Sequence, residues 1–188
     1  KQRVNLARAL AANPDVLICD EVTSALDTVV AAAILDLIDN LRRDLGIATI
    51  FISHDISTAR AFCDDLMVLY AGSVVELASR ARFSDGVHQP YTRLLMDSVP
   101  DMDTTWLARR GTSEVPAMSG QGPKPVALAA GLCPFLSRCP VAVGGKCDSV
   151  PPPRQERAGQ VVMCHRDWDQ LAIRPAARMA GELSESPR

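Results

Sequence analysis

Two clusters of polar side chains in the first third of the sequence could carry out chemistry. Asp20 and Glu21 come directly after the apolar run 16–19, and His54 follows the run 47–52. Successive side chains on a strand point to opposite faces, so the two adjacent acids can take different tasks. One carboxylate suits a hard cation, and the other suits a water molecule that must be oriented or deprotonated. Phosphoryl transfer to water needs such a pair, although an acidic pair after a strand is also typical of a helix N-cap.

The apolar patterns around these residues predict the elements that hold them in place. Apolar positions recur at helical spacing in residues 1–12 and 28–45, and Gly46 supplies a stop for the second of these helices. The runs before Asp20 and His54 are typical of strands that are covered on both faces in a parallel sheet. The predicted order is helix 1–12, strand 16–19, helix 28–45, strand 47–52, helix 57–63, strand 66–70 and a hairpin to strand 74–77.

This alternation of strands and helices predicts an α/β domain with a largely parallel sheet. In open sheets of this class, ligands bind outside the carboxyl ends of the strands. We therefore expect Asp20, Glu21 and His54 to converge on one site, although 33 residues separate the second acid from the histidine.

The composition argues against several classes of protein. The chain has 188 residues, 47% of them hydrophobic, which is enough for one sizeable core and a small satellite module. Its 20 Lys and Arg residues are balanced by 22 Asp and Glu residues, so no basic excess drives binding to nucleic acid. The longest apolar stretch, residues 29–35, is far below the roughly 20 residues that span a bilayer. We expect a soluble globular protein with no signal segment and no nucleic-acid partner.

An ordered series of short motifs runs through about the first 77 residues: QRV at 2–4, ARAL at 7–10, NP at 13–14, LICDE at 17–21, TSALD at 23–27 and ISHD at 52–55. The series resembles the second half of an ABC-transporter ATPase, with the parallel sheet of P-loop NTPases. The resemblance implies that Asp20 serves the Mg²⁺ of ATP and that Glu21 is the general base for the attacking water. It also implies that His54 contacts the γ-phosphate. Ser24 and Asp27 would lie in the D-loop at the interface with a second ATPase subunit.

Two departures from that family limit what the chain is expected to do. Val22 stands where the family usually has proline, which loosens the turn after the general base without removing a chemical group. The 188 residues also contain neither the phosphate-binding pattern G-x-x-x-x-G-K-[ST] nor the signature motif Leu-Ser-Gly-Gly. We therefore expect residues 1–84 to be the C-terminal part of an ABC ATPase domain. The chain would be a C-terminal fragment that does not bind or hydrolyse ATP by itself, although its parent would be an ATPase.

The segment 85–100 narrows the family. Residues 87–95, VHQPYTRLL, resemble the His-Pro-Tyr-Thr segment of importers for dipeptides, oligopeptides and nickel, with Gln89 inserted between the histidine and the proline. Pro90 is suited to the first position of a helix whose Leu94 and Leu95 pack back onto the core. Residues 101–131 are typical of a linker, and residues 169–188 of a disordered tail.

A small module, residues 132–168, holds four of the six cysteines: Cys133, Cys139, Cys147 and Cys164. The other two, Cys19 and Cys63, fall in predicted core elements. The module has so little apolar mass that it needs a staple, and four thiols supply one as two disulfides, a zinc site or a [4Fe–4S] cluster, unless they stay unmetallated.

The cellular compartment, the cysteine spacing and the family resemblance help to distinguish these alternatives. A cytosolic ATPase disfavours disulfides, and the tight C-x2–4-C pattern of zinc sites is missing. The C-terminal extension of the importer group carries a similar pattern, and some members hold an iron–sulfur cluster there. The resemblance therefore favours a cluster on the four cysteines over a zinc site or unmetallated thiols, with His165 as an alternative ligand.

The resemblance implies the energy-coupling ATPase subunit of a peptide-type importer, for dipeptides, oligopeptides or nickel. Its cofactors would be ATP and Mg²⁺. Its partners would be a second ATPase subunit, permease subunits at the cytoplasmic face of the cell membrane and, indirectly, a solute-binding protein. One alternative is a DNA-repair or chromosome-organising ATPase of the same superfamily, and another is a metal-binding protein without enzymatic activity. The lack of a long heptad segment and of a basic stripe favours the importer.

Overall fold

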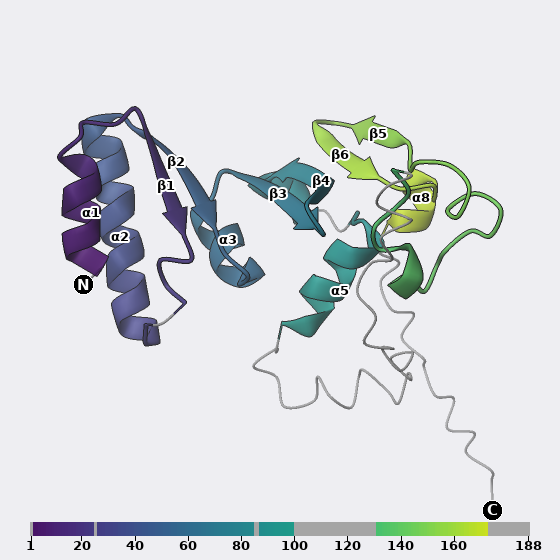
Figure 1. Ribbon diagram of the computed structural model, residues 1–188, viewed down its shortest axis with the longest axis horizontal. Coiled ribbons are helices and arrows are strands. Elements are labelled where there is room, and N and C mark those ends of the chain that lie inside the picture. The colour runs from purple at the N-terminus through teal and green to yellow at the C-terminus, as the bar shows by residue number, and fades with distance from the viewer. Residues whose placement is uncertain (1, 25, 85–86, 100–130, 173–188) are drawn as a thin grey trace, which may run out of the picture.

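The strands of the part of the chain that the structure describes lie in two separate sheets, joined by a short helical connection (Figure 1). The computed structural model describes residues 2–24, 26–84, 87–99 and 131–172. The helices are α1 Gln2–Leu10, α2 Thr28–Leu45, α3 Ile56–Phe62, α4 Arg80–Phe83, α5 Pro90–Ser98 and α8 Trp168–Leu171, with a 3-10 turn, η1, at Leu136–Arg138. The strands are β1 Val16–Asp20, β2 Ala48–Ile52, β3 Asp65–Tyr70, β4 Ser73–Ser79, β5 Arg154–Arg157 and β6 Gln160–Met163.

The first sheet consists of β1 and β2, which pair in parallel, and α2 covers one of its faces. The long helix begins where Asp27 accepts a hydrogen bond from the amide of Val30 at 2.9 Å, and it ends at Gly46, whose φ of 66° an L side chain rarely adopts. Ile34 and Ile38 of α2 are buried in the same core cluster as Leu17 and Cys19 of β1, together with Ile47. The predicted helix 28–45 and the parallel pairing of the first two strands are confirmed.

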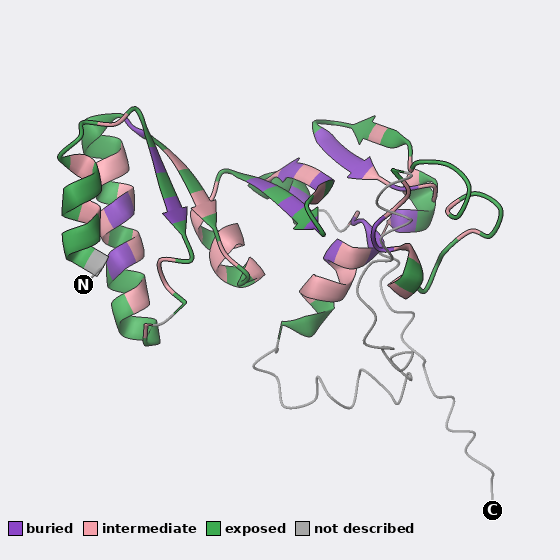
Figure 2. Ribbon diagram, in the orientation of Figure 1, coloured by how far each residue is buried: buried purple, intermediate pink, exposed green. Residues whose placement is uncertain are grey.

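Buried and exposed residues alternate along β1 (Figure 2), and the exposed ones lie on the opposite face of the sheet. Ile18 of β1 is 63% exposed and Ile50 of β2 is 51% exposed, and these two residues are partners in the register. The prediction that both strands are covered on both faces is therefore wrong for the part of the chain that the structure describes. An apolar run shows that both faces suit a core, but the run does not show what covers each face.

The second sheet is antiparallel, with the order β3-β4-β6-β5. The predicted hairpin between β3 and β4 is confirmed, but β3 does not extend the parallel sheet, so the prediction of a largely parallel sheet holds only for β1 and β2. Strand β6, from the cysteine-bearing segment, pairs with β4 through Glu76 opposite Val162 and Leu77 opposite Val161. The cysteine-bearing segment thus shares a sheet with residues from the predicted ATPase part.

An aromatic cluster fixes α5 and η1 against this second sheet. Phe135 is fully buried, and its ring centroid lies 5.3 Å from that of Tyr70 and 5.4 Å from that of Tyr91. Pro90 begins α5 as predicted, and Leu94 and Leu95 pack against the same core. The predicted linker, 101–131, lies almost entirely outside the described residues, as do residues 173–188 of the predicted tail.

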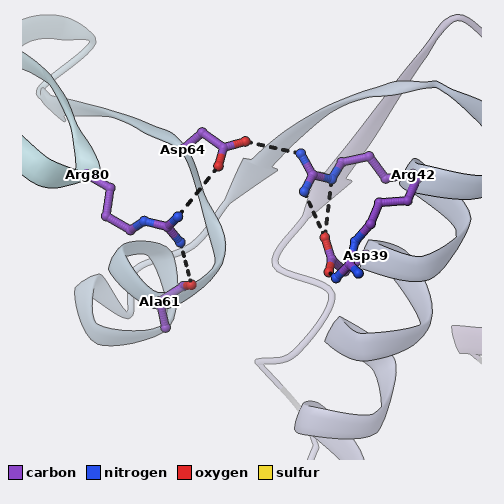
Figure 3. A network of polar contacts seen from close by, with 6 residues as sticks. Asp39, Arg42, Ala61, Asp64 and Arg80 are labelled. Atoms are coloured by element: carbon purple, nitrogen blue, oxygen red, sulfur yellow. Dashed lines mark hydrogen bonds and ion pairs between the residues drawn. The ribbon is translucent and has the colours of Figure 1, made fainter.

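Asp64 links the two parts of the fold (Figure 3). One of its carboxylate oxygens lies 3.1 Å from Arg42 of α2, and the other lies 3.8 Å from Arg80 of α4. Arg80 also donates to the carbonyl of Ala61 at 3.2 Å. These side chains border an open hollow of about 420 Å³ that neither Glu21 nor His54 lines. Within the described residues, no helix has both the length and the hydropathy needed to cross a bilayer.

Candidate functional site

The carboxyl edge of the parallel sheet brings Glu21 and His54 together. Asp20 is paired with Ile52 at the ends of the two strands, and the amide of Glu21 donates to the carbonyl of Ile52 at 3.0 Å. His54 Nδ1 lies 3.2 Å from Glu21 Oε1, although 33 residues separate the two side chains in the sequence. The predicted convergence of the acid and the histidine is confirmed.

Asp20 lies on a different side of the strand from the buried core residues. It continues the exposed row that Val16 and Ile18 form, since side chains alternate along a strand. Asp20 is exposed, so its carboxylate is open to a cation from solvent, while the carboxylate of Glu21 is held beside His54. The two acids have different surroundings, as division of labour between them requires.

Glu21 has a left-handed backbone conformation, with φ of 46°. Residues other than glycine adopt this conformation at a cost, and such residues are often found at functional sites. Ser24 holds the turn: its hydroxyl donates to the carbonyl of Glu21 at 2.9 Å and its amide donates to the same oxygen at 3.1 Å. Val22, which stands in place of proline, packs against the core below the sheet. The turn is therefore fixed by hydrogen bonds and packing.

Asp27 occupies the N-cap of α2, six residues beyond Glu21. The alternative interpretation of Asp20 and Glu21 as a helix cap is therefore wrong, because another residue has that role. Ser24 and Asp27 are both exposed, and each stabilises one part of the segment between β1 and α2.

Asp55 was missed as a candidate by sequence reasoning, although an aspartate just before an apolar helical segment is an N-cap signal. Its carboxylate accepts hydrogen bonds from the amide of Ser57 at 2.9 Å and from the hydroxyl of Thr58. Burial raises the pKa of Asp55, but the hydrogen bonds from Thr58 and Ser57 and the charge of His54 outweigh burial and leave the pKa below its ordinary value. An ionised carboxylate is thus fixed next to the histidine.

The acid–histidine edge, by which we mean Asp20, Glu21 and His54, is open to solvent. The side chains of Glu21 and His54 are 52% and 72% exposed. A carboxylate that contacts an imidazole can orient and deprotonate a water molecule, and exposure leaves room for a polar substrate beside the pair. This arrangement fits proton transfer to or from a polar substrate that enters from solvent.

The four cysteines of the C-terminal segment line one small pocket, together with Gln89 and Pro90 at the start of α5. Cys133 and Cys139 lie on either side of η1, Cys147 follows in a loop, and Cys164 comes just after β6. Burial raises the pKa of Cys133, Cys139 and Cys164, and that of Cys139 rises to about 11. The structure thus places the four thiols around one pocket, and what they bind stays a prediction.

The donor atoms of this four-thiol pocket fit a thiophilic group in kind and number. Among residues 2–24, 26–84, 87–99 and 131–172, however, no three or more His, Cys, Asp or Glu side chains are arranged to hold a metal ion. A zinc ion needs four sulfurs about 2.3 Å from one centre, so the arrangement does not match a formed zinc site. A [4Fe–4S] cluster also needs four cysteine sulfurs around one core, each bound to a different iron.

The structure also gives the positions and contacts of the remaining candidates, His165, Cys19 and Cys63. His165 borders the four-thiol pocket, and its Nε2 lies 3.1 Å from the carbonyl oxygen of Val150. Cys19 is buried in the first sheet as predicted, whereas Cys63 is only partly buried at the end of α3. Sequence reasoning missed Glu76, which is fully buried in β4. The only signal in the sequence is a carboxylate inside an apolar strand.

Comparison with known proteins identifies relatives that align with most of the chain. Residues 75–147 match the family described as the C-terminal region of oligopeptide/dipeptide transporters. The chain is 41% identical over 166 residues to a peptide import ATP-binding protein of Brucella abortus, covering 88% of this chain and 47% of that relative. It is 35% identical over 167 residues to another of that name from Brucella ovis, covering 89% of this chain and 51% of the relative. The chain spans about half the length of the curated relatives it matches.

Proposed function

The chain belongs to the oligopeptide/dipeptide transporter family of ATP-binding proteins, and from this premise we propose that it forms part of the ATPase subunit of a peptide-type ABC importer. The observation that supports the proposal most directly is the 3.2 Å contact between Glu21 and His54 at the carboxyl edge of a parallel sheet. Phosphate-binding proteins of this architecture place their reacting groups at that edge.

Each residue of the acid–histidine edge has a distinct proposed role. Glu21 accepts the proton of the attacking water, and His54 holds Glu21 in place and donates a hydrogen bond to the γ-phosphate. Asp20, exposed at the end of β1, fits the water shell of Mg²⁺, which offsets the phosphate charge when it is bound. The 188 residues contain no phosphate-binding loop sequence, so hydrolysis is proposed for a full-length ATPase that contains them.

The proposed partners follow from the same family. Ser24 and Asp27 lie in the exposed turn beside Glu21, where they would contact a second ATPase subunit. Closure of the two ATPase subunits would be coupled to permease subunits at the cytoplasmic face of the cell membrane. A solute-binding protein would deliver the solute. The names of the relatives support peptides as the solute, with nickel as the alternative. The same names favour an importer over a DNA-repair ATPase.

Replacing Glu21 with glutamine tests the proposed general base. In a full-length ATPase containing these residues, E21Q should lower ATP hydrolysis by about 10²–10⁴-fold, because the amide cannot accept the proton. ATP-dependent dimerisation should be retained, as measured by size-exclusion chromatography. E156Q is the matched control, since Glu156 is an exposed residue of β5, and it should leave turnover unchanged. Normal turnover in E21Q would refute the role of Glu21 as the general base.

A second proposed function concerns the four-thiol pocket, which we propose holds an iron–sulfur cluster. The supporting observation is that Cys133, Cys139, Cys147 and Cys164 line one pocket although they come from different segments. A cluster bound there would cross-link η1, the following loop and the end of β6, in a structural or redox-sensing role.

Anaerobic purification followed by iron and sulfide analysis tests this second function. Wild-type protein should carry about four irons per chain and absorb near roughly 400 nm. C147S should lose most of the iron, whereas C63S should retain it, because Cys63 lies outside the pocket. Iron-free protein with four reactive thiols would instead support a pocket of unmetallated cysteines.

A further inference from the structure

A carboxylate with no exposure to solvent lies at the centre of the second sheet. Glu76 of β4 is 0% exposed, and three nitrogen atoms face its two oxygens. His88 Nδ1 lies 2.9 Å from Oε1, the side chain of Gln160 donates to Oε1 at 3.0 Å, and the amide of Gln89 donates to Oε2 at 2.8 Å. A buried charge is stable only with partners of this kind.

We propose that Glu76 is a positioning residue for the four-thiol pocket, because it holds two walls of that pocket at once. Through Gln89 it fixes the start of α5, and through Gln160 it fixes the strand that leads to Cys164. The inference builds on the thiol-pocket part of the proposed function, but it concerns the shape of the pocket and not the group that the pocket holds.

The first wall is the start of α5. The side chain of Gln89 accepts a hydrogen bond from the amide of Tyr91 at 2.5 Å and so caps the helix, while its own amide is bound by Glu76. Gln89 is 1% exposed, and both Gln89 and Pro90 line the four-thiol pocket. The residue that is inserted relative to the family pattern is thus the one through which the carboxylate of Glu76 places the helix.

The second wall is the end of β6. The side-chain nitrogen of Gln160 donates to Glu76 at 3.0 Å and to the carbonyl of Val87 at 2.6 Å, so both of its hydrogens are used. Val162 is paired with Glu76 in the β4–β6 register, and Cys164, two residues later, lines the pocket. Loss of the carboxylate would therefore release the strand that carries this cysteine.

The substitution E76Q disrupts the hydrogen bonds that connect Glu76 to both walls, with little change in side-chain volume. Gln160 donates to one oxygen of Glu76 and the amide of Gln89 donates to the other. An amide has one oxygen in place of two, so at least one of these two donors meets an NH₂ group instead of an acceptor. The walls should separate and expose the thiols, while the first sheet, which Glu76 does not contact, should stay folded.

Alkylation of each cysteine by iodoacetamide, followed by peptide mass spectrometry, tests the inference on the metal-free 188-residue chain. E76Q should raise the alkylation rates of Cys133, Cys139 and Cys164 by at least about tenfold. Cys63, which lies outside the pocket, should keep its rate, and Cys19, buried in the first sheet, should stay protected. E156Q, the same change at an exposed site, should have no effect.

A second variant keeps the test decisive if E76Q unfolds the whole chain, which reaction of Cys19 would reveal. Q160A leaves the contact between Glu76 and Gln89 in place but removes the hold on β6, so it should raise the alkylation rate of Cys164 more than that of Cys133. Unchanged pocket thiols in a folded E76Q, or an equal increase at Cys63 in either variant, would overturn the inference. Iron-free wild-type protein would reject the cluster without affecting this result, because the test uses metal-free protein.

Discussion

The acid–histidine edge and the four-thiol pocket differ most in how they are built. At the edge, Glu21 and His54 are brought together by the register of two parallel strands, and their side chains remain 52% and 72% exposed. The pocket is assembled from segments far apart in the chain and rests on Phe135 and Glu76, both 0% exposed. One site depends on backbone hydrogen bonds at a sheet edge, and the other depends on core packing.

This difference shows how strongly each site should respond to change elsewhere in the molecule. Reacting groups at an open edge keep their relative positions as long as β1 and β2 stay paired. Thiols in a packed pocket lose their arrangement when any wall moves, since interiors are close-packed. Mutations in the two cores should therefore show the difference between the sites more clearly than mutations at the protein surface.

The largest expected effect is that of truncating the core beneath each site. F135A removes the ring that packs on Tyr70 and Tyr91, and it should lower the free energy of unfolding of the second sheet by about 3–5 kcal/mol. I38A, in the core of the first sheet, should lower that of the first sheet by about 2–5 kcal/mol.

Urea unfolding, followed by alkylation of Cys139 and Cys19 as reporters of the two sheets, measures both effects. F135A should expose Cys139 at lower urea than Cys19, and I38A should do the reverse. V150A, at a residue 48% exposed, is a control that should change little. Equal shifts of both reporters in both variants would show that the two regions unfold as one unit.

A smaller effect is expected on the chemistry of the pocket thiols. Because burial raises the pKa of Cys139 to about 11, only about one thiol in a thousand is ionised at pH 8 in metal-free protein. Alkylation at pH 8 should be about a hundredfold slower than for a thiol of pKa 9, and should accelerate as the pH rises toward 11. A Cys139 rate in folded protein equal to that in urea would contradict the burial of the pocket.

The smallest effect should come from the ion pairs that link the two parts. Arg42 pairs with both Asp64 and Asp39, and R42A removes both contacts. Because the side chain of Asp64 is 66% exposed, the expected loss of stability is under about 1 kcal/mol. Added salt should shrink the difference between R42A and wild type. A loss of several kcal/mol in thermal unfolding would mean that the link between the regions is stronger than an exposed ion pair.

Much of the first region could be predicted from local patterns. Residues 28–45 were predicted as a helix ending at Gly46, because the apolar stripe and the glycine are both local signals. The rule for strand ends predicted the meeting of Glu21 and His54. What could not be predicted was the bare face at Ile18 and Ile50, because a run of apolar residues carries no information about what covers it.

The second region was harder to predict because its contacts are long-range. The gathering of four cysteines followed from their number and from the need for a staple. The pairing of β6 with β4 and the burial of Glu76 did not follow, since Glu76 and Gln160 are 84 residues apart and no periodicity relates them. The role of Gln89 also depends on the carboxylate of Glu76, so the sequence alone could not predict what the inserted residue does.

The long loop closed by β4 and β6 has a consequence for the order in which the molecule forms. The β3–β4 hairpin needs only the turn at Ala71 and Gly72, whereas β6 must find β4 across 84 residues, and closing a long loop slows such contacts. We expect the hairpin to form early during synthesis and β6 to dock late. Until that docking we expect Cys164 to lie apart from Cys133, Cys139 and Cys147, so a group that needs all four thiols would be bound only once the second sheet is complete.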